Sequence, residues 1–228
     1  MAPDKLHQKR KAHAAKELKR REATRSTYKR ALVVCEDGKS SATYFKEIRA
    51  SQRIQTLNMK VIGAGCDPKR LVETAVEEFR KHPDYDYVLC VFDRDSHNHY
   101  QNAVASIQQT PLTMKCGRKS AGQADFRAIT SEPCFEFWLL LHFTDHTAPI
   151  APSGGRSIGE QTEHLLKQHW PAYHKGSAGI FQHLENRRAA AGQLAAAGLL
   201  RASANGTSNP HTHVHEAVDI LFSLRGTQ

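Results

Sequence analysis

The amino-acid sequence predicts an α/β fold, in which a parallel-sheet core flanked by helices carries a basic helical N-terminal arm and a helical C-terminal region. Short unbroken apolar segments alternate with segments of helical periodicity between residues 31 and 150. Lys and Arg are concentrated in residues 1–30, and three helical patterns follow one another after residue 151. The 228 residues match the length of one domain with an elaboration. We therefore divide the chain into an arm (1–30), a core (31–150) and a helical region (151–228).

The strands and helices are predicted in order along the chain. Apolar runs typical of strands buried on both faces occupy residues 31–35 and 87–92, and further strands are expected over 57–62 and 112–116. Amphipathic segments between them predict helices over 40–53, 68–81 and 100–108, the second beginning with Asp67 as N-cap and Pro68 at the first helical position. Because helices join successive strands, the strands are expected to be parallel. The later helices are expected at 158–169, 178–200 and 214–224.

The net charge of +9 belongs almost entirely to the arm. Residues 1–30 contain eleven Lys or Arg and three acidic residues, a net of +8, which leaves +1 for the other 198 residues. A basic arm of this kind binds phosphate groups, with release of counterions, or else solubilises the protein or docks a partner. The candidate nucleic-acid-binding residues are Lys19, Arg20, Arg21, Lys29, Arg30 and Lys39.

Hydropathy and cysteine spacing predict a cytoplasmic protein that does not enter the membrane. The mean hydropathy is −0.57, and no apolar run approaches the roughly 20 residues needed to span a bilayer. The basic N-terminus lacks the apolar segment of a secretory signal. Five cysteines occur singly, which favours reduced thiols over a disulfide framework or a zinc ribbon.

Acidic residues follow two of the predicted strands. Glu36 comes directly after the first strand, and Asp93 and Asp95 come after the third. Because ligands bind outside the carboxyl ends of parallel strands, these carboxylates are candidates to hold Mg²⁺ or Mn²⁺. Glu36 is expected to act as a metal ligand or as a general acid or base. The alternative is that all three make ordinary turns and caps.

The chain contains four distinctive blocks, in this order, between about residues 31 and 224: LVVCEDGKSSATYFKEI, YVLCVFDRDSH, ITSEPCFEFWLLLHF and NPHTHVHEAVDIL. Together they resemble RloB-like proteins, a branch of the Toprim-like fold found in bacterial antiviral loci. The resemblance implies a metal-dependent phosphodiesterase site, in which Glu36 matches the Toprim glutamate and Asp93 and Asp95 match its Asp-x-Asp pair. It also implies an ATPase partner. Gly38-Lys39-Ser40 lacks the upstream glycine of a P-loop, so that ATPase is expected to be another chain.

These observations predict a Toprim-like, Mg²⁺-dependent nuclease that acts on DNA or RNA, tRNA included, as the effector of an ATPase-coupled antiphage system. The alternative is a non-catalytic module that binds nucleic acid or a partner through the basic arm. A phosphotransferase or nucleotide-binding protein is a weaker hypothesis, because the chain has no Gly-rich phosphate loop. Homo-oligomerisation is left open.

Residues around a later apolar segment have two interpretations. Glu136 shares a helix face with Leu139, Leu140 and Phe143, where a buried carboxylate is costly unless it is paired or binds metal. Glu136 is therefore either a further metal ligand or a structural acid. Ser131 and Glu132, which precede Pro133, are expected to cap this helix. Arg94 is expected to pair structurally on the far face of its strand, with phosphate contact as the alternative.

The fourteen histidines and the later basic pairs give weaker signals. His97 and His99 are expected to face solvent at a helix start. His211, His213 and His215 alternate, but i and i+2 residues diverge on a helix, so a helix start is favoured over a metal site. His174-Lys175 and Arg187-Arg188 are expected to be exposed charges, with phosphate contact as the alternative.

Overall fold

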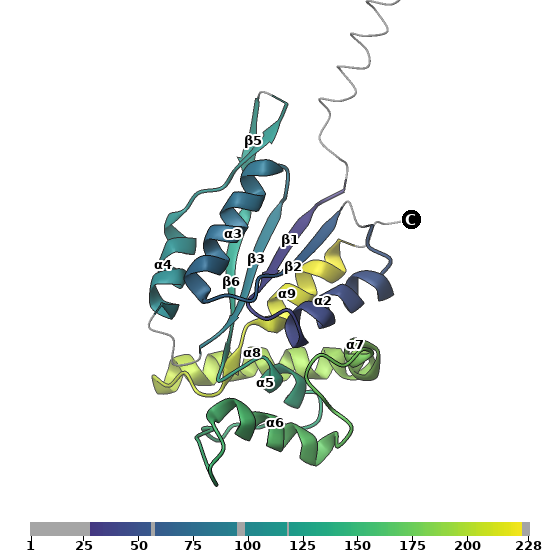
Figure 1. Cartoon of the computed structure of the whole chain (residues 1–228), viewed down its shortest axis with the longest axis vertical. Helices are drawn as coiled ribbons and strands as arrows, with labels where there is room; N and C mark the ends of the chain where they lie inside the picture. Colours follow the sequence, from purple (N-terminus) through teal and green to yellow (C-terminus); the bar gives the residue numbers. More distant parts are fainter. Residues whose placement is uncertain (1–27, 56–57, 95–98, 118, 225–228) are drawn as a thin grey trace, which may run out of the picture.

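A five-stranded sheet forms the centre of the computed structural model, which describes residues 28–55, 58–94, 99–117 and 119–224 (Figure 1). The strand order is β2-β1-β3-β6-β7. Strands β2, β1, β3 and β6 are parallel, and β7 pairs antiparallel with β6. The strands are β1 (Ala31–Cys35), β2 (Met59–Gly63), β3 (Tyr87–Asp93), β6 (Asp125–Glu132) and β7 (His211–Thr212). The predicted α/β class with a mostly parallel sheet flanked by helices is confirmed.

The first half of the sheet agrees closely with the prediction. The connecting helices are α2 (Ser40–Ser51), α3 (Pro68–Lys81) and α4 (Tyr100–Gln109). Asp67 caps α3, since its side chain accepts hydrogen bonds from the backbone N–H groups of Lys69 and Arg70 at 3.0 and 3.3 Å. The chain leaves β1 toward β2 on one side and returns to β3 on the other, so the carboxyl ends of β1 and β3 flank the point where the strand order reverses.

The fourth strand of the sheet was placed wrongly from the sequence. The segment 112–116 forms β4 (Thr113–Cys116), which pairs with β5 (Lys119–Gln123) in a separate antiparallel hairpin. The strand beside β3 is β6, with Tyr87 opposite Asp125 and Asp93 opposite Ser131. Its sequence, DFRAITSE, has no apolar run, because only three consecutive residues of β6 are buried.

The expected capping role of Ser131 and Glu132 is also corrected. Both residues belong to the end of β6. The N-cap residue of α5 (Glu136–Leu140) is Phe135, which makes no side-chain capping hydrogen bond. The Ser131 and Thr212 hydroxyls are hydrogen-bonded at 2.8 Å. Glu132 forms an ion pair with Arg94 at 2.6 Å, which confirms the structural pairing predicted for that arginine.

The later helices are α6 (Ile158–His169), α7 (Ile180–Leu184), α8 (Arg188–Asn205) and α9 (Val214–Ser223), with a 3₁₀ turn at Glu185–Arg187. The single helix expected over 178–200 is thus divided. Glu47 of α2 fixes the start of α7, because its carboxylate accepts the N–H groups of Gly179 and Phe181 at 2.6 and 2.8 Å. A tertiary contact with α2 therefore sets a boundary that helix propensity alone does not mark.

Side chains alternate between two cores on either face of the sheet. Ala31, Val33 and Cys35 of β1 pack in one cluster with α2, α5 and the helices from α6 to α9. Leu32 and Val34 pack in the other with α3 and α4. The first cluster joins residues from both sides of position 150. In Figure 1, α5, α6 and α8 lie toward the carboxyl ends of the strands.

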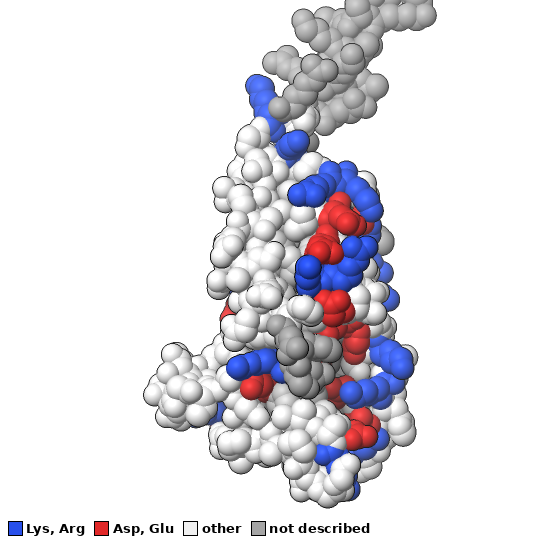
Figure 2. Space-filling model, turned by 60° about the vertical axis from the view of Figure 1, so that its left-hand side comes forward, with Lys and Arg blue, Asp and Glu red and all other residues white. Residues whose placement is uncertain are grey.

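The surface of the body carries mixed charges. On the face seen in Figure 2, basic and acidic side chains lie together in one band and do not form a patch of a single sign. This agrees with a body whose charge is nearly balanced. Among the residues that the structure describes, no helix combines the length and the apolar character needed to cross a membrane.

Candidate functional site

Glu36 and Asp93 lie side by side at the carboxyl ends of β1 and β3. The two strands are paired in parallel, with Cys35 opposite Val91. The Glu36 Oε2 atom accepts a hydrogen bond of 3.0 Å from the Asp93 backbone N–H, and the Glu36 N–H donates to the Val91 carbonyl at 2.8 Å. The backbone therefore orients the Glu36 carboxylate toward the end of β3. Asp95, the third predicted member, lies outside the described residues.

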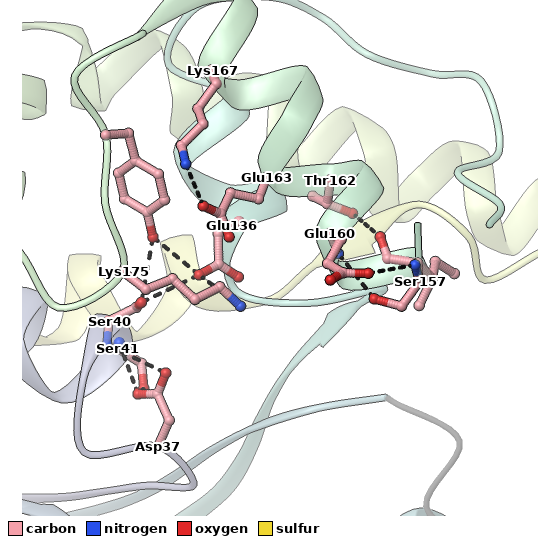
Figure 3. A network of polar contacts seen from close by, with 12 residues as sticks. Asp37, Ser40, Ser41, Glu136, Ser157, Glu160, Thr162, Glu163, Lys167 and Lys175 are labelled. Carbon is pink, nitrogen blue, oxygen red and sulfur yellow. Dashed lines mark hydrogen bonds and ion pairs between the residues drawn. The ribbon is translucent and has the colours of Figure 1, made fainter. Parts of the chain in front are cut away.

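The loop between β1 and α2 is held by Asp37, which sequence reasoning overlooked. Its Oδ1 atom accepts the Ser41 N–H at 3.1 Å and the Ser41 hydroxyl at 2.8 Å, and its Oδ2 atom accepts the Ser40 N–H at 3.3 Å (Figure 3). These bonds satisfy N–H groups in the first turn of α2. The sequence signal for this role was an acidic residue three positions before the Ser40-Ser41 pair.

Glu136 is a buried acid with three donors around one oxygen. Its Oε1 atom accepts hydrogen bonds from the Tyr173 hydroxyl at 3.0 Å and the Ser40 hydroxyl at 3.2 Å, and the Lys175 Nζ atom lies 3.5 Å away (Figure 3). Ser40 and Tyr173 are fully buried. Burial and then the Glu136 charge raise the pKa of Tyr173, so this hydroxyl stays a donor. These donors compensate for the cost of burying a carboxylate, as the interpretation of Glu136 as a structural acid required.

The charges of two acids, Asp93 and Glu136, both affect the buried thiol of Cys134. Its thiol is buried, and burial, followed by the charges of Glu136 and Asp93, raises its pKa well above the ordinary value. Sequence reasoning did not select this residue. Ser131 of β6 is opposite Asp93 of β3, and Cys134 and Glu136 follow the end of β6, so Asp93 and Glu136 belong to the same edge of the sheet.

The donor chemistry at this edge suits a hard cation, because Glu36 and Asp93 offer carboxylate oxygens. Within the described ranges, no group of three or more His, Cys, Asp or Glu side chains is arranged to hold a metal ion. The predicted set includes Asp95, which those ranges omit. The metal-ligand roles of Glu36, Asp93, Asp95 and Glu136 stay predictions.

The histidines near the end of the chain are used in local contacts. His211 lies in β7, and its Nδ1 atom contacts the Ser208 carbonyl. His213 precedes α9, and its Nδ1 atom lies 3.0 Å from the Thr130 hydroxyl. This agrees with a helix start after residue 213.

The predicted nucleic-acid-binding residues fall into separate places. Lys19, Arg20 and Arg21 lie outside the described residues. Lys29 donates to the Tyr87 hydroxyl at 3.0 Å, and Arg30 forms an ion pair with Asp84, both at the amino end of the sheet. Strands rise about 3.3 Å per residue, so Arg30 is about 20 Å along the chain from Glu36. Lys39 alone lies beside the carboxylates, in the loop after β1.

The fold and this edge define an α/β protein with acidic residues at the reversal point of a parallel sheet. A family model described as RloB-like protein matches residues 31–221, from the first residue of β1 into α9. The chain belongs to the RloB-like family. No curated protein and no solved structure matches it. The basic arm lies outside the matched region.

Proposed function

We propose that this RloB-like protein is a Toprim-like, Mg²⁺-dependent nuclease. It hydrolyses phosphodiester bonds in DNA or RNA, tRNA included, as the effector of an ATPase-coupled antiphage system in the cytoplasm. The observation that carries the proposal is the meeting of Glu36 and Asp93 at adjacent strand ends, joined by the 3.0 Å hydrogen bond. The five cysteines occur singly along the sequence, with no CxxC pair, which fits a reducing compartment.

Glu36, Asp93 and Asp95 would hold the cation. A bound Mg²⁺ or Mn²⁺ supplies neutralisation of the scissile phosphate and lowers the pKa of a coordinated water. The Asp93 N–H fixes the Oε2 atom of Glu36 and so limits the rotation of that carboxylate. In the proposed mechanism, Glu36 would accept a proton from the attacking water.

The test is a cleavage assay on the full chain with labelled DNA, RNA and tRNA in Mg²⁺, in Mn²⁺ and in excess EDTA. Glu36→Gln and Asp93→Asn should each lower the rate about 100-fold or more, because each removes a charge from the cation site. Asp125→Asn is the matched control, since Asp125 pairs with Arg127 at the start of β6. Retained cleavage in the double variant Glu36→Gln/Asp93→Asn would exclude the proposed mechanism.

A second candidate, a non-catalytic nucleic-acid-binding module, is favoured by one observation. The arm carries a net charge of +8 and lies outside the family match. This candidate predicts that removal of residues 1–27 abolishes binding and that affinity falls steeply with added salt. Metal-dependent turnover that survives this deletion favours the enzyme.

A further inference from the structure

Lys175 is held by a buried carboxylate on one side and reaches solvent on the other. Its side chain is 45% exposed, whereas that of Glu136 is 3% exposed. The distance of 3.5 Å between Lys175 Nζ and Glu136 Oε1 exceeds the 2.7–2.9 Å or so of a close charge-assisted hydrogen bond. The same oxygen is already bonded by the Ser40 and Tyr173 hydroxyls. Glu136 therefore balances the charge of Lys175 and leaves ammonium donors directed elsewhere.

The segment that carries Lys175 lies against the loop that carries Glu36. A Cβ atom added to Gly176 would lie 3.4 Å from Lys39 Cβ, and Gly176 has a φ of +80°, a conformation that favours glycine. Lys39 follows Glu36 by three residues. Lys175 is therefore fixed beside the β1–α2 loop.

Lys175 lies at the same edge of the sheet as Asp93. Its Nζ atom is 3.5 Å from Glu136, which follows the end of β6, and β6 pairs with β3 so that Ser131 is opposite Asp93. A second acid nearby, Glu163, is paired with Lys167 at 2.7 Å (Figure 3). Lys175 is thus a cation beside Glu136, at the edge of the sheet that carries Glu36 and Asp93.

We infer that Lys175 binds a phosphate oxygen of the nucleic-acid substrate and that Glu136 is its positioning residue. The inference rests on the proposed function and deepens it. A lysine ammonium is a compact point charge suited to a phosphate oxygen. The buried Glu136, with its two hydroxyl donors, fixes one side of that charge, so less side-chain freedom is lost when phosphate binds. This gives Glu136 a role other than metal ligation.

The first experiment compares kinetics of Lys175→Met, Lys175→Arg and the matched control Lys60→Met in the full chain. Lys60 is also a half-exposed lysine on a nearly buried acid, with its Nζ atom 2.5 Å from Glu78. Lys175→Met should lower kcat/KM about 10- to 100-fold, and Lys175→Arg should recover most of that loss. Lys60→Met should stay within about twofold of the original chain. Unchanged kinetics in Lys175→Met, with an unchanged Tm, would overturn the inference.

Glu136→Gln separates positioning from metal ligation. Glutamine keeps an oxygen acceptor for Ser40 and Tyr173 but removes the charge beside Lys175. A positioning role predicts a higher KM for substrate at an unchanged Mg²⁺ concentration for half-maximal rate. A several-fold rise in that Mg²⁺ concentration at unchanged KM would overturn it in favour of a metal ligand.

A binding measurement in EDTA distinguishes failure of this inference from failure of the proposed function. Fluorescence anisotropy with a short labelled single-stranded oligonucleotide, as DNA and as RNA, needs no turnover. Lys175→Met should weaken binding and reduce the dependence of log affinity on log salt by about one contact, whereas Lys60→Met should not. Absence of metal-dependent cleavage in the original chain would reject the nuclease. Normal cleavage and binding by Lys175→Met would reject the phosphate contact alone.

Discussion

Mild acid is expected to destabilise the protein through His142, which is buried just after α5. Its Nδ1 atom lies 2.9 Å from the Trp138 carbonyl, so Nδ1 carries the proton and Nε2 is the bare nitrogen. Nε2 is buried and has no hydrogen-bond partner within the described residues. Protonation would therefore bury an N–H group without an acceptor. Burial, with a smaller contribution from the charges of Arg187 and Arg188, lowers the pKa of His142 from 6.5 to about 4.

The sign and size of the effect follow from this lowered pKa. Above pH 6.5, the imidazole is neutral in both folded and unfolded chains, and stability is unaffected. As pH falls from 6.5 toward 4, the unfolded chain binds a proton that the folded chain does not, so unfolding becomes easier. At about 1.4 kcal/mol per pH unit, the full loss is about 3 kcal/mol, of which about 2 kcal/mol is lost by pH 5.

The assay is urea unfolding at about pH 7.5 and pH 5, which gives the free energy of unfolding at each pH. His142→Asn keeps a donor for the Trp138 carbonyl and cannot titrate, so its stability should fall about 2 kcal/mol less than that of the original chain. His174→Asn, at an exposed position, should behave like the original chain. Equal losses in the original chain and His142→Asn would refute the reasoning.

Three further predictions concern packing, capping and thiols. Gly63→Ala should lower the free energy of unfolding, measured in urea, by about 1–3 kcal/mol, because the added Cβ would lie 2.6 Å from Gly38 Cα. The control Gly159→Ala, whose methyl group meets open space, should raise it by up to about 1 kcal/mol. Ser157→Ala removes a capping-box side chain at the start of α6 and should cost about 1 kcal/mol in the same assay; unchanged stability would contradict this. A disulfide reagent such as DTNB should label the partly exposed Cys66 and Cys116 in the folded chain, because Cys35, Cys90 and Cys134 are buried and the reagent cannot reach them; labelling of all five thiols before unfolding would contradict this.

The parts of the fold that could be predicted are those with local signals. β1 and residues 88–92 of β3 are apolar and buried, since helices cover both faces of the sheet, and Asp67-Pro68 marks the start of α3 by its own chemistry. β6 has only three consecutive buried residues and so gives no apolar run. Its place in the sheet comes from its register with β3, a long-range pairing that hydrophobic periodicity does not encode.

The candidate site likewise contains some features that the sequence could predict and others that it could not. Glu36 and Asp93 were predictable because each follows an apolar strand, and parallel strands end at one edge. The contacts of Glu136 were not, since Ser40 precedes it by 96 residues and Tyr173 follows it by 37. Sequence reasoning could state only that a buried acid needs partners. The structure supplies those partners, and with them the position of Lys175.

Lys29 and Arg30, the last residues of the basic arm, lie at the end of the sheet opposite the carboxylates, and this separation changes how the two candidate functions relate. Arg30 joins the arm to the body at the amino end of β1, whereas Glu36 lies about 20 Å further along, at the carboxyl end. At that end, Lys39 and Lys175 are near the acids and can neutralise phosphates there without the arm. The arm therefore need not supply the charge at the proposed reaction centre. Under the proposed function, its +8 would raise the local concentration of nucleic acid or dock a partner, and the loops after the strands would contact the scissile phosphate. Binding through the arm and hydrolysis at the sheet edge are thus compatible in one molecule.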